Sequence, residues 1–418
     1  MPPPVIVNPL EALKAVTEKI KKGKTTRVPV EDCVGHFLAD PIPGPRVSGG
    51  FPWDPPDTLR AAIDGYALPD GSGTGDQVDI QASPPEADSA PGQALLPGAG
   101  IRVEVGSPLP VNTWAILPVG DGTLLVGGKL RIDHLPQPGE GIAGKETSSP
   151  GEFKSGSLLS PREQAYLLAA GIQNVGVHCL PRVGVLLLGN ELTDLKAEKE
   201  EGQVYDLNGY WLTSSIQALG LDVIPFGISE DGPEGLRKHL VRCHTRQVDI
   251  LMISGGTGAG ITDRTAEAIR EMNGKVLFEK LSLHGCDSLV FGKLNNMDVL
   301  ALSGRPLSCA AGFDLYGRPL ILARSGAAKG YWNWANVLYQ DETLTPPPPS
   351  NNRQLEWCLQ AGKLIGNRSE PVTLPVVKAW NPETLFSPVV PGSEGWILRP
   401  PGPLENPVYF SRHSQQVF

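Results

Sequence analysis

Apolar runs of strand length alternate with helix-like segments in the middle of the chain, and this alternation constrains the fold more than any other sequence feature. Residues 183–188 read VGVLLL, a nearly continuous apolar run of the kind that forms a strand covered on both faces. Helix-like and strand-like segments then follow in turn at 208–219, 222–226, 233–243 and 248–253. Asn208 is the expected N-cap of the first of these helices. Residues 182–328 are therefore predicted to form a parallel α/β layer.

The stretches on either side of this layer differ in composition and in hydrophobic pattern. Residues 41–150 are rich in proline and glycine and carry short alternating runs between turn residues, which predicts a β-rich piece of short strands. Four prolines at 346–349 predict a stiff linker, and residues 355–418 beyond it read as a small β module. The segment 9–20 has one apolar face and is predicted to be a helix that packs on the α/β layer.

Charge and cysteine usage argue against several classes of function. The formal net charge is −9 without a block of basic residues, which argues against nucleic acid or an acidic membrane as the main partner. Six cysteines are scattered without a C-x-x-C pair, a pattern that favours reduced thiols over disulfides or a zinc cluster. No apolar run is long enough to span a bilayer and the N-terminus lacks signal-peptide features, so a cytoplasmic protein is predicted.

Acidic residues and a glycine-rich loop follow the predicted strands. Glu191 follows the first strand and Asp231 the second, while the loop 254–260, SGGTGAG, follows the third and leads to Asp263. Ligands of an open parallel sheet bind beyond the carboxyl ends of its strands, so these groups are expected to converge on one edge. Backbone N–H groups of the loop would hold a phosphate, and the carboxylates would hold Mg²⁺.

Lys280, which leaves the next strand-like run at 276–281, would add a positive charge to the same anion. Each residue alone has an ordinary alternative. The loop lacks the spacing of a dinucleotide fingerprint or a P-loop and by itself is a tight turn, and Asp263 by itself is a helix cap. His284 reads as a polar loop residue and Cys286 as a buried thiol. Only the shared position at one sheet edge favours a functional site.

Six segments carry a more specific signal. They are IDGYA at 63–67, VGSPLP at 105–110, GNEL at 189–192, VYDLN at 204–208, SGGTGAGITD at 254–263 and LSGRP at 302–306. In the same order they resemble M-D-G-Y-A, T-G-A-P-x-P, G-D-E-L, I-x-D-x-N, S-G-G-V-S-x-G-x-x-D and L-P-G-N-P, motifs of the molybdopterin molybdotransferase family. This family is the MoeA and gephyrin E-domain group, and the resemblance runs from about residue 9 to residue 319.

The resemblance implies a multidomain α/β plus β fold, elongated and homodimeric, with four domains in each subunit. The implied domains are an α/β molybdopterin-binding domain (8–23 and 181–328), a β-rich inserted domain (43–151), a small linking domain (24–42 and 152–180) and a C-terminal β domain (329–418). In the family the β-rich domain reaches the partner subunit's cleft, so Asp64 would be supplied across the dimer.

The resemblance also implies a reaction. With Mg²⁺ and molybdate, the family converts adenylylated molybdopterin to molybdenum cofactor and AMP, and a molybdopterin adenylyltransferase is an expected partner. The implied catalytic residues are Asp64, Asp231, Asp263 and Lys280. The implied metal ligands are Glu191, Asp231 and Asp263. The implied ligand-binding residues are Ser254, Gly255, Gly256, Gly260, Asn208, His284 and Arg305.

The chain departs from the family pattern on the molybdate side. Where the family reads K-P-G-K-P, residues 284–288 read HGCDS, while Ser303 and Arg305 replace a proline and an asparagine. Asp287 would repel a dianion that lysine attracts, by about 1–4 kcal/mol for a unit pair at ~4 Å, and Arg305 would compensate in part.

Two main hypotheses follow. The preferred one is a working transferase in which His284 and Arg305 supply the missing charges. The alternative is a catalytically impaired paralogue that binds a pterin or nucleotide, or scaffolds partners. A nucleotide-binding enzyme unrelated to molybdenum is a third hypothesis.

Overall fold

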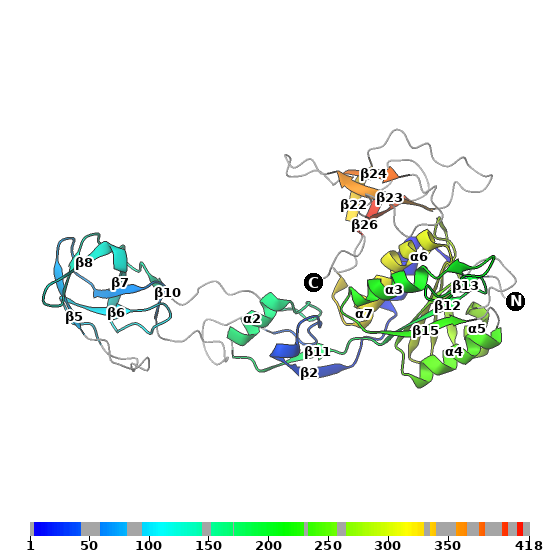
Figure 1. Cartoon of the computed structure of the whole chain (residues 1–418), viewed down its shortest axis with the longest axis horizontal. Coiled ribbons are helices and arrows are strands. Elements are labelled where there is room, and N and C mark those ends of the chain that lie inside the picture. Colours follow the sequence, from blue (N-terminus) through cyan, green and yellow to red (C-terminus); the bar gives the residue numbers. More distant parts are fainter. Residues whose placement is uncertain are drawn as a thin grey trace. The chain divides into compact units, whose positions relative to one another are not determined.

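The protein is seen in a computed structural model (Figure 1). The structure describes residues 4–42, 59–81, 94–143, 152–169, 171–229, 233–256, 265–329, 335–339, 357–365, 376–380, 395–399 and 408–412. The chain forms two compact units. One unit holds Met1–Pro41, Lys154–Ala165 and Gln173–Phe418, and the other holds Ile42–Phe153 and Tyr166–Ile172. The four predicted domain boundaries stay a prediction.

The first unit is built on a six-stranded sheet in the order β15-β12-β16-β21-β20-β17. In chain order its strands are β12 (Val183–Leu188), β15 (Val223–Ser229), β16 (Ile250–Ser254), β17 (Lys275–Phe278), β20 (Val290–Leu294) and β21 (Met297–Leu302). β15, β12, β16 and β21 run parallel, and β20 is antiparallel to both of its neighbours. The chain goes from β12 to β15 on one side and then to β16 on the other, so the strand order reverses between β12 and β16. Ligands of open α/β sheets bind at such a reversal.

Helices cover both faces of this sheet (Figure 1). They are α1 (Pro9–Glu18), α3 (Asn208–Gln217), α4 (Pro233–Thr245), α5 (Thr265–Glu271), α6 (Pro306–Gly312) and α7 (Arg318–Arg324), with a π-helical segment, Phe313–Gly317, between α6 and α7. Val183 and Val185 of β12 pack in one core with residues of α1, α3 and α7, whereas Leu186 and Leu188 pack in a second core with residues of α4 and α5. Burial of both faces explains why β12 reads as a continuous apolar run.

The N-terminus belongs to this α/β layer, as predicted. The side chain of Asn8 accepts from Glu11 N–H at 2.9 Å and Glu11 Oε2 accepts from Asn8 N–H at 3.0 Å, so α1 begins with a complete capping box. β1 (Ile6–Val7) pairs in parallel with β18 (Lys280–Leu281). The single strand predicted at 276–281 is therefore wrong, because the chain leaves β17 and pairs with β1 instead.

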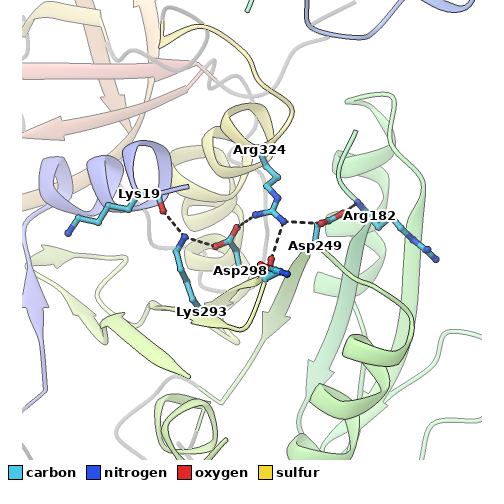
Figure 2. Close-up of polar contacts among 7 residues, drawn as sticks. Lys19, Arg182, Asp249, Lys293, Asp298 and Arg324 are labelled. Atoms are coloured by element: carbon cyan, nitrogen blue, oxygen red, sulfur yellow. Dashed lines mark hydrogen bonds and ion pairs between the residues drawn. The ribbon is translucent and has the colours of Figure 1, made fainter. Parts of the chain in front are cut away.

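A buried charge network lies at the amino ends of the parallel strands (Figure 2). Arg324 contacts Asp249 Oδ1 at 2.9 Å through Nη2 and Asp298 Oδ2 at 3.2 Å through Nη1. Lys293 Nζ lies 3.3 Å from Asp298 Oδ1, and Asp249 Oδ2 accepts from Arg182 N–H at 3.0 Å. Burial raises the pKa of the Asp298 carboxyl, while Lys293 and Arg324 act in the opposite direction.

A C-terminal sheet belongs to the same unit. Its order is β19-β23-β24-β22-β26-β25, and a further β23–β25 pairing closes it. The strands are β19 (Leu283–His284), β22 (Ala335–Tyr339), β23 (Trp357–Ile365), β24 (Val376–Trp380), β25 (Gly395–Arg399) and β26 (Val408–Arg412). Trp396 Nε1 of β25 donates to Asp314 Oδ2 of the π-helical segment at 2.8 Å, which anchors the sheet on the α/β layer.

The second unit contains another six-stranded sheet, in the order β7-β4-β6-β5-β9-β8. Its strands are β4 (Gly65–Pro69), β5 (Gln77–Gln81), β6 (Ala99–Val103), β7 (Thr113–Pro118), β8 (Gly122–Leu125) and β9 (Lys129–Ile132). The predicted combination of an α/β core with β-rich pieces is confirmed. No helix among the described residues is long and apolar enough to cross a membrane.

Candidate functional site

The described part of the glycine-rich loop lies at the strand-order reversal. Gly255 has φ +94°, and a Cβ there would lie 2.2 Å from the carbonyl oxygen of Leu188 at the end of β12. Gly256 has φ +65°, and its Cβ would lie 2.7 Å from Leu188 Cδ1. Glycine is required at position 255, where the turn after β16 approaches the backbone of β12 too closely for a side chain, and it is favoured at position 256 by the positive φ.

The backbone N–H groups of this turn are not equivalent. The N–H of Gly255 donates to Leu302 O at 3.0 Å, so it is engaged inside the protein and not free for a ligand. The N–H of Gly256 has no acceptor among the residues that the structure describes. The Thr265 hydroxyl donates to Gly256 O at 3.3 Å and so ties the turn to the start of α5. The rest of the loop, residues 257–260, lies outside the described residues, so the phosphate cradle stays a prediction.

Asn208 connects three segments at this edge. Its Nδ2 donates to Ser254 Oγ at 2.8 Å and to the carbonyl oxygen of Gly304 at 2.8 Å. Ser254 is 2% exposed and its hydroxyl donates to Ser303 O at 3.3 Å. Asn208 and Ser254 therefore position the turn through internal hydrogen bonds.

The expected N-cap role of Asn208 is wrong. Asn208 is the first residue of α3, and Asp206 Oδ1 accepts from Gly209 N–H at 2.7 Å instead. The physical reason is that the Asn208 amide donates to Ser254 and Gly304. Burial raises the pKa of the Asp206 carboxyl, the Gly209 N–H lowers it, and the charge of Asp194 raises it.

Asp206, which accepts from Gly209 N–H at the start of α3, has a role near this edge that the sequence patterns alone did not assign. Its position two residues before Asn208, in the VYDLN segment, was the available signal. An acid just before a helix that starts at the carboxyl edge of the sheet can accept from the free N–H groups of that helix.

Of the three acids predicted to bind Mg²⁺, the structure describes Glu191. Glu191 is exposed just after β12, and its carboxylate lies beside Gly189, where a Cβ would meet Glu191 Oε2 at 2.8 Å. Asp231, Asp263 and Gly260 lie outside the described residues. Among the described residues no group of three His, Cys, Asp or Glu side chains forms a metal site. The convergence of the three acids therefore stays a prediction.

Asp64 and Lys280 lie in different units. Asp64 is exposed in the second unit, where its Oδ1 accepts from Val105 N–H at 2.8 Å. Lys280 is half-buried at the start of β18, opposite Ile6 of β1. No described carboxylate forms an ion pair with its ammonium group. Lys280 is thus a cation without a described acidic partner.

The two segments that depart from the family pattern contact each other. Arg305 Nη2 lies 3.3 Å from Asp287 Oδ1, and Ser308 Oγ donates to Gly285 O at 2.8 Å. His284 lies in β19, paired with β23 of the C-terminal sheet. Cys286 is 1% exposed, and burial raises the pKa of its thiol to about 12, so it is a buried thiol as expected.

Comparison with known proteins accounts for this architecture. A family model described as the MoeA N-terminal region (domain I and II) matches residues 7–171. A second, described as a probable molybdopterin binding domain, matches residues 184–323, from β12 to α7. The chain belongs to the MoeA-like family. The second match contains the glycine turn, Asn208 and Arg305.

Curated relatives and solved structures of MoeA proteins extend these matches. The chain is 27% identical over 323 residues to "Molybdopterin molybdenumtransferase 1" of Mycobacterium tuberculosis, covering 71% of this chain and 73% of the relative. It is 28% identical over 279 residues to "Molybdopterin molybdenumtransferase" of Haemophilus influenzae, covering 66% and 68%. A crystal structure of the molybdopterin biosynthesis MoeA protein from a Pyrococcus species superposes with a TM-score of 0.70 at 25% identity, over 98% of this chain and 100% of the other. The MoeA-like fold thus extends over nearly the whole chain.

Proposed function

We propose that this chain is a molybdopterin molybdenumtransferase, which inserts molybdenum from molybdate into adenylylated molybdopterin during molybdenum cofactor biosynthesis. The observation that carries the proposal is the glycine turn at the β12–β16 reversal, held by Asn208 inside the segment matched by the molybdopterin-binding model. Relatives whose alignments cover about two-thirds or more of this chain carry this name. The alternative of a binding or scaffolding paralogue has no comparable support.

The chemistry expected of the site is positional and electrostatic. The turn at Gly256 would bind a phosphate of the substrate through backbone N–H groups, and Lys280 would add positive charge. Mg²⁺ would be held by Glu191, Asp231 and Asp263, an all-oxygen donor set that suits this hard cation. Of these three, Glu191 is the described one, and its exposed carboxylate has no described cationic partner. When bound, Mg²⁺ would neutralise the charge of the substrate pyrophosphate.

The assembly belongs to the same proposal. We propose a cytoplasmic homodimer in which Asp64 of one subunit serves the site of the other, with a molybdopterin adenylyltransferase supplying the pterin nucleotide. The division of the chain into two units, with Asp64 exposed in the second, is consistent with a side chain presented to another subunit. Concentration-dependent sedimentation would detect the dimer, and a strictly monomeric protein would contradict this part of the proposal.

Reconstitution tests the activity. Purified protein is mixed with adenylylated molybdopterin, Mg²⁺ and molybdate, and AMP release is measured. AMP release that requires both molybdate and Mg²⁺ is the expected result. Tight binding of the pterin nucleotide with no AMP at any molybdate concentration would reject catalysis. The Asp263→Asn variant tests the metal site, because a pure helix-cap role predicts unchanged Mg²⁺-dependent binding.

A further inference from the structure

Arg305 and Asp287 form an ion pair between two segments that leave different strands. The segments are joined at three points. Arg305 Nη2 lies 3.3 Å from Asp287 Oδ1, Ser308 Oγ donates to Gly285 O at 2.8 Å, and Cys286 Sγ lies 3.6 Å from Ser308 O. The local backbone is therefore fixed by two buried or half-buried contacts beside the exposed ion pair.

Arg305 lies at the same sheet edge as the glycine turn. It follows β21, the parallel neighbour of β16, and Gly255 N–H donates to Leu302 O at the end of β21. The residue before it, Gly304, accepts from Asn208 Nδ2 at 2.8 Å. The guanidinium therefore emerges at the carboxyl edge, where ligands of parallel sheets bind.

The ion pair is weak enough to be exchanged. The side chains of Arg305 and Asp287 are 52% and 56% exposed, and water screens a pair of this exposure strongly. One nitrogen of Arg305 makes the contact, and a guanidinium carries five N–H donors in a fork that suits tetrahedral oxyanions. A doubly charged oxyanion that accepts two of those hydrogen bonds is a stronger partner than one carboxylate oxygen at 3.3 Å.

We propose that Arg305 is an oxyanion-binding residue whose partner in the free protein is Asp287, and that an incoming tetrahedral dianion displaces the Asp287 carboxylate. Asp287 thereby determines the affinity of the site, because each binding event exchanges one anionic partner of Arg305 for another. The inference rests on the proposed function for the source of the anion, which is molybdate or a phosphate of the pterin nucleotide.

Binding of molybdate alone to the full-length protein tests the exchange. We expect Asp287→Asn to lower the dissociation constant for molybdate by roughly three- to tenfold at low salt, with a smaller gain at high salt. Glu271→Gln is the matched control, because it removes one negative charge from another exposed ion pair, Arg237–Glu271, whose side chains are 52% and 42% exposed. The control is expected to bind molybdate as the wild type does.

The background of Arg305→Gln separates exchange from a general charge effect. Arg305→Gln is expected to weaken molybdate binding, and adding Asp287→Asn to it should then change the affinity little. An equal gain from Asp287→Asn with and without Arg305, or no gain for either molybdate or phosphate in the wild-type background, would overturn the proposal. Binding of inorganic phosphate is measured in parallel. A gain confined to phosphate supports the exchange and assigns the subsite to the pterin nucleotide.

These measurements need no turnover. If the protein shows the exchange but releases no AMP, the proposed transferase activity is wrong and the oxyanion site is retained. If it releases AMP while Asp287→Asn leaves the affinities for molybdate and phosphate unchanged, the oxyanion proposal is wrong and the transferase activity is retained.

Discussion

The side-chain amide of Asn208 donates a 2.8 Å hydrogen bond to the hydroxyl of Ser254 and so connects the first turn of α3 to the last residue of β16. A second bond from the same nitrogen reaches Gly304 after β21. One amide group thus holds the ends of two neighbouring parallel strands in register with a helix. The predicted site depends on this arrangement, because the glycine turn follows directly from Ser254.

Asn208→Ala is expected to loosen the turn. The variant leaves the Gly304 carbonyl without this donor and the buried Ser254 hydroxyl without one partner, at a cost of about 1–3 kcal/mol in the free energy of unfolding. Binding of the pterin nucleotide should weaken as well. Asn208→Asp can accept from the Ser254 hydroxyl but cannot donate to Gly304. This variant should therefore also be less stable than the wild type and bind the pterin nucleotide more weakly. Urea unfolding and calorimetric binding check both effects, and wild-type values for Asn208→Ala would refute the role.

Gly255→Ala is expected to distort the turn. A residue with a Cβ at φ +94° is strained by about 1–3 kcal/mol, and the 2.2 Å approach to Leu188 O adds a clash with backbone. Gly304→Ala is the neighbouring control, because among the described residues its Cβ would meet only Gly255 Cα, at an ordinary 3.6 Å. Thermal unfolding should show a lowered midpoint for Gly255→Ala and a small change for Gly304→Ala. Equal shifts would show that the close approach is not what requires glycine at 255.

Arg324→Met is expected to be strongly destabilising. The variant leaves the buried Asp298 carboxylate without one of its two cations and Asp249 with only the Arg182 N–H among its described partners (Figure 2). The free energy of unfolding should fall by about 3–5 kcal/mol. Arg237→Met, which breaks the exposed pair with Glu271, serves as the control and should change stability little. Chemical denaturation of both variants provides the measurement. Comparable losses in the two would contradict a special role for burial.

Asp206→Asn is expected to alter the pH dependence of stability. Burial raises the folded-state pKa of Asp206 above its ordinary value of 3.8, so the native state binds more protons than the unfolded chain between those two values. The stability that this carboxyl contributes is therefore greatest below the ordinary pKa and falls as the pH rises through the folded-state pKa. The difference in unfolding free energy between wild type and variant should decline across this window and then level off.

Denaturation of both proteins at a series of pH values from about 3 to 7 measures that difference. Asp222→Asn, an exposed acid of the same unit, changes the charge equally and controls for the net charge of the chain. A difference that rises with pH would mean that hydrogen bonding from Gly209 outweighs burial at Asp206.

The fold could be predicted from the sequence where local pattern alone decides it. β12 reads as an apolar run because both of its faces are buried, and Pro9 and Asn8 mark the start of α1 by ordinary capping chemistry. The division of the predicted strand at 276–281 could not be read, because it depends on pairing with Ile6 and Val7 at the far end of the chain.

In the candidate site, too, local sequence predicts some features, whereas others depend on contacts between residues that are distant in sequence. The turn after β16 could be predicted, because glycines at positions 255 and 256 suit the positive φ angles and the close approach of the Leu188 carbonyl to Gly255. The role of Asn208 could not be predicted from its neighbours, because its partners Ser254 and Gly304 are distant in sequence. The contact between Asp287 and Arg305 could not be predicted from local sequence either, because the two residues lie 18 positions apart. The roles of Asp231 and Asp263, which lie outside the described residues, stay predictions.

The parallel pairing of β1 with β18 has a consequence for synthesis on the ribosome. Val5 N–H donates to Glu279 Oε1 across a separation of 274 residues, so the first strand has no partner until most of the chain has been made. At ~5–20 residues per second, the N-terminal segment waits for on the order of half a minute before it can dock. We therefore expect the α/β layer to close only after translation has passed β18.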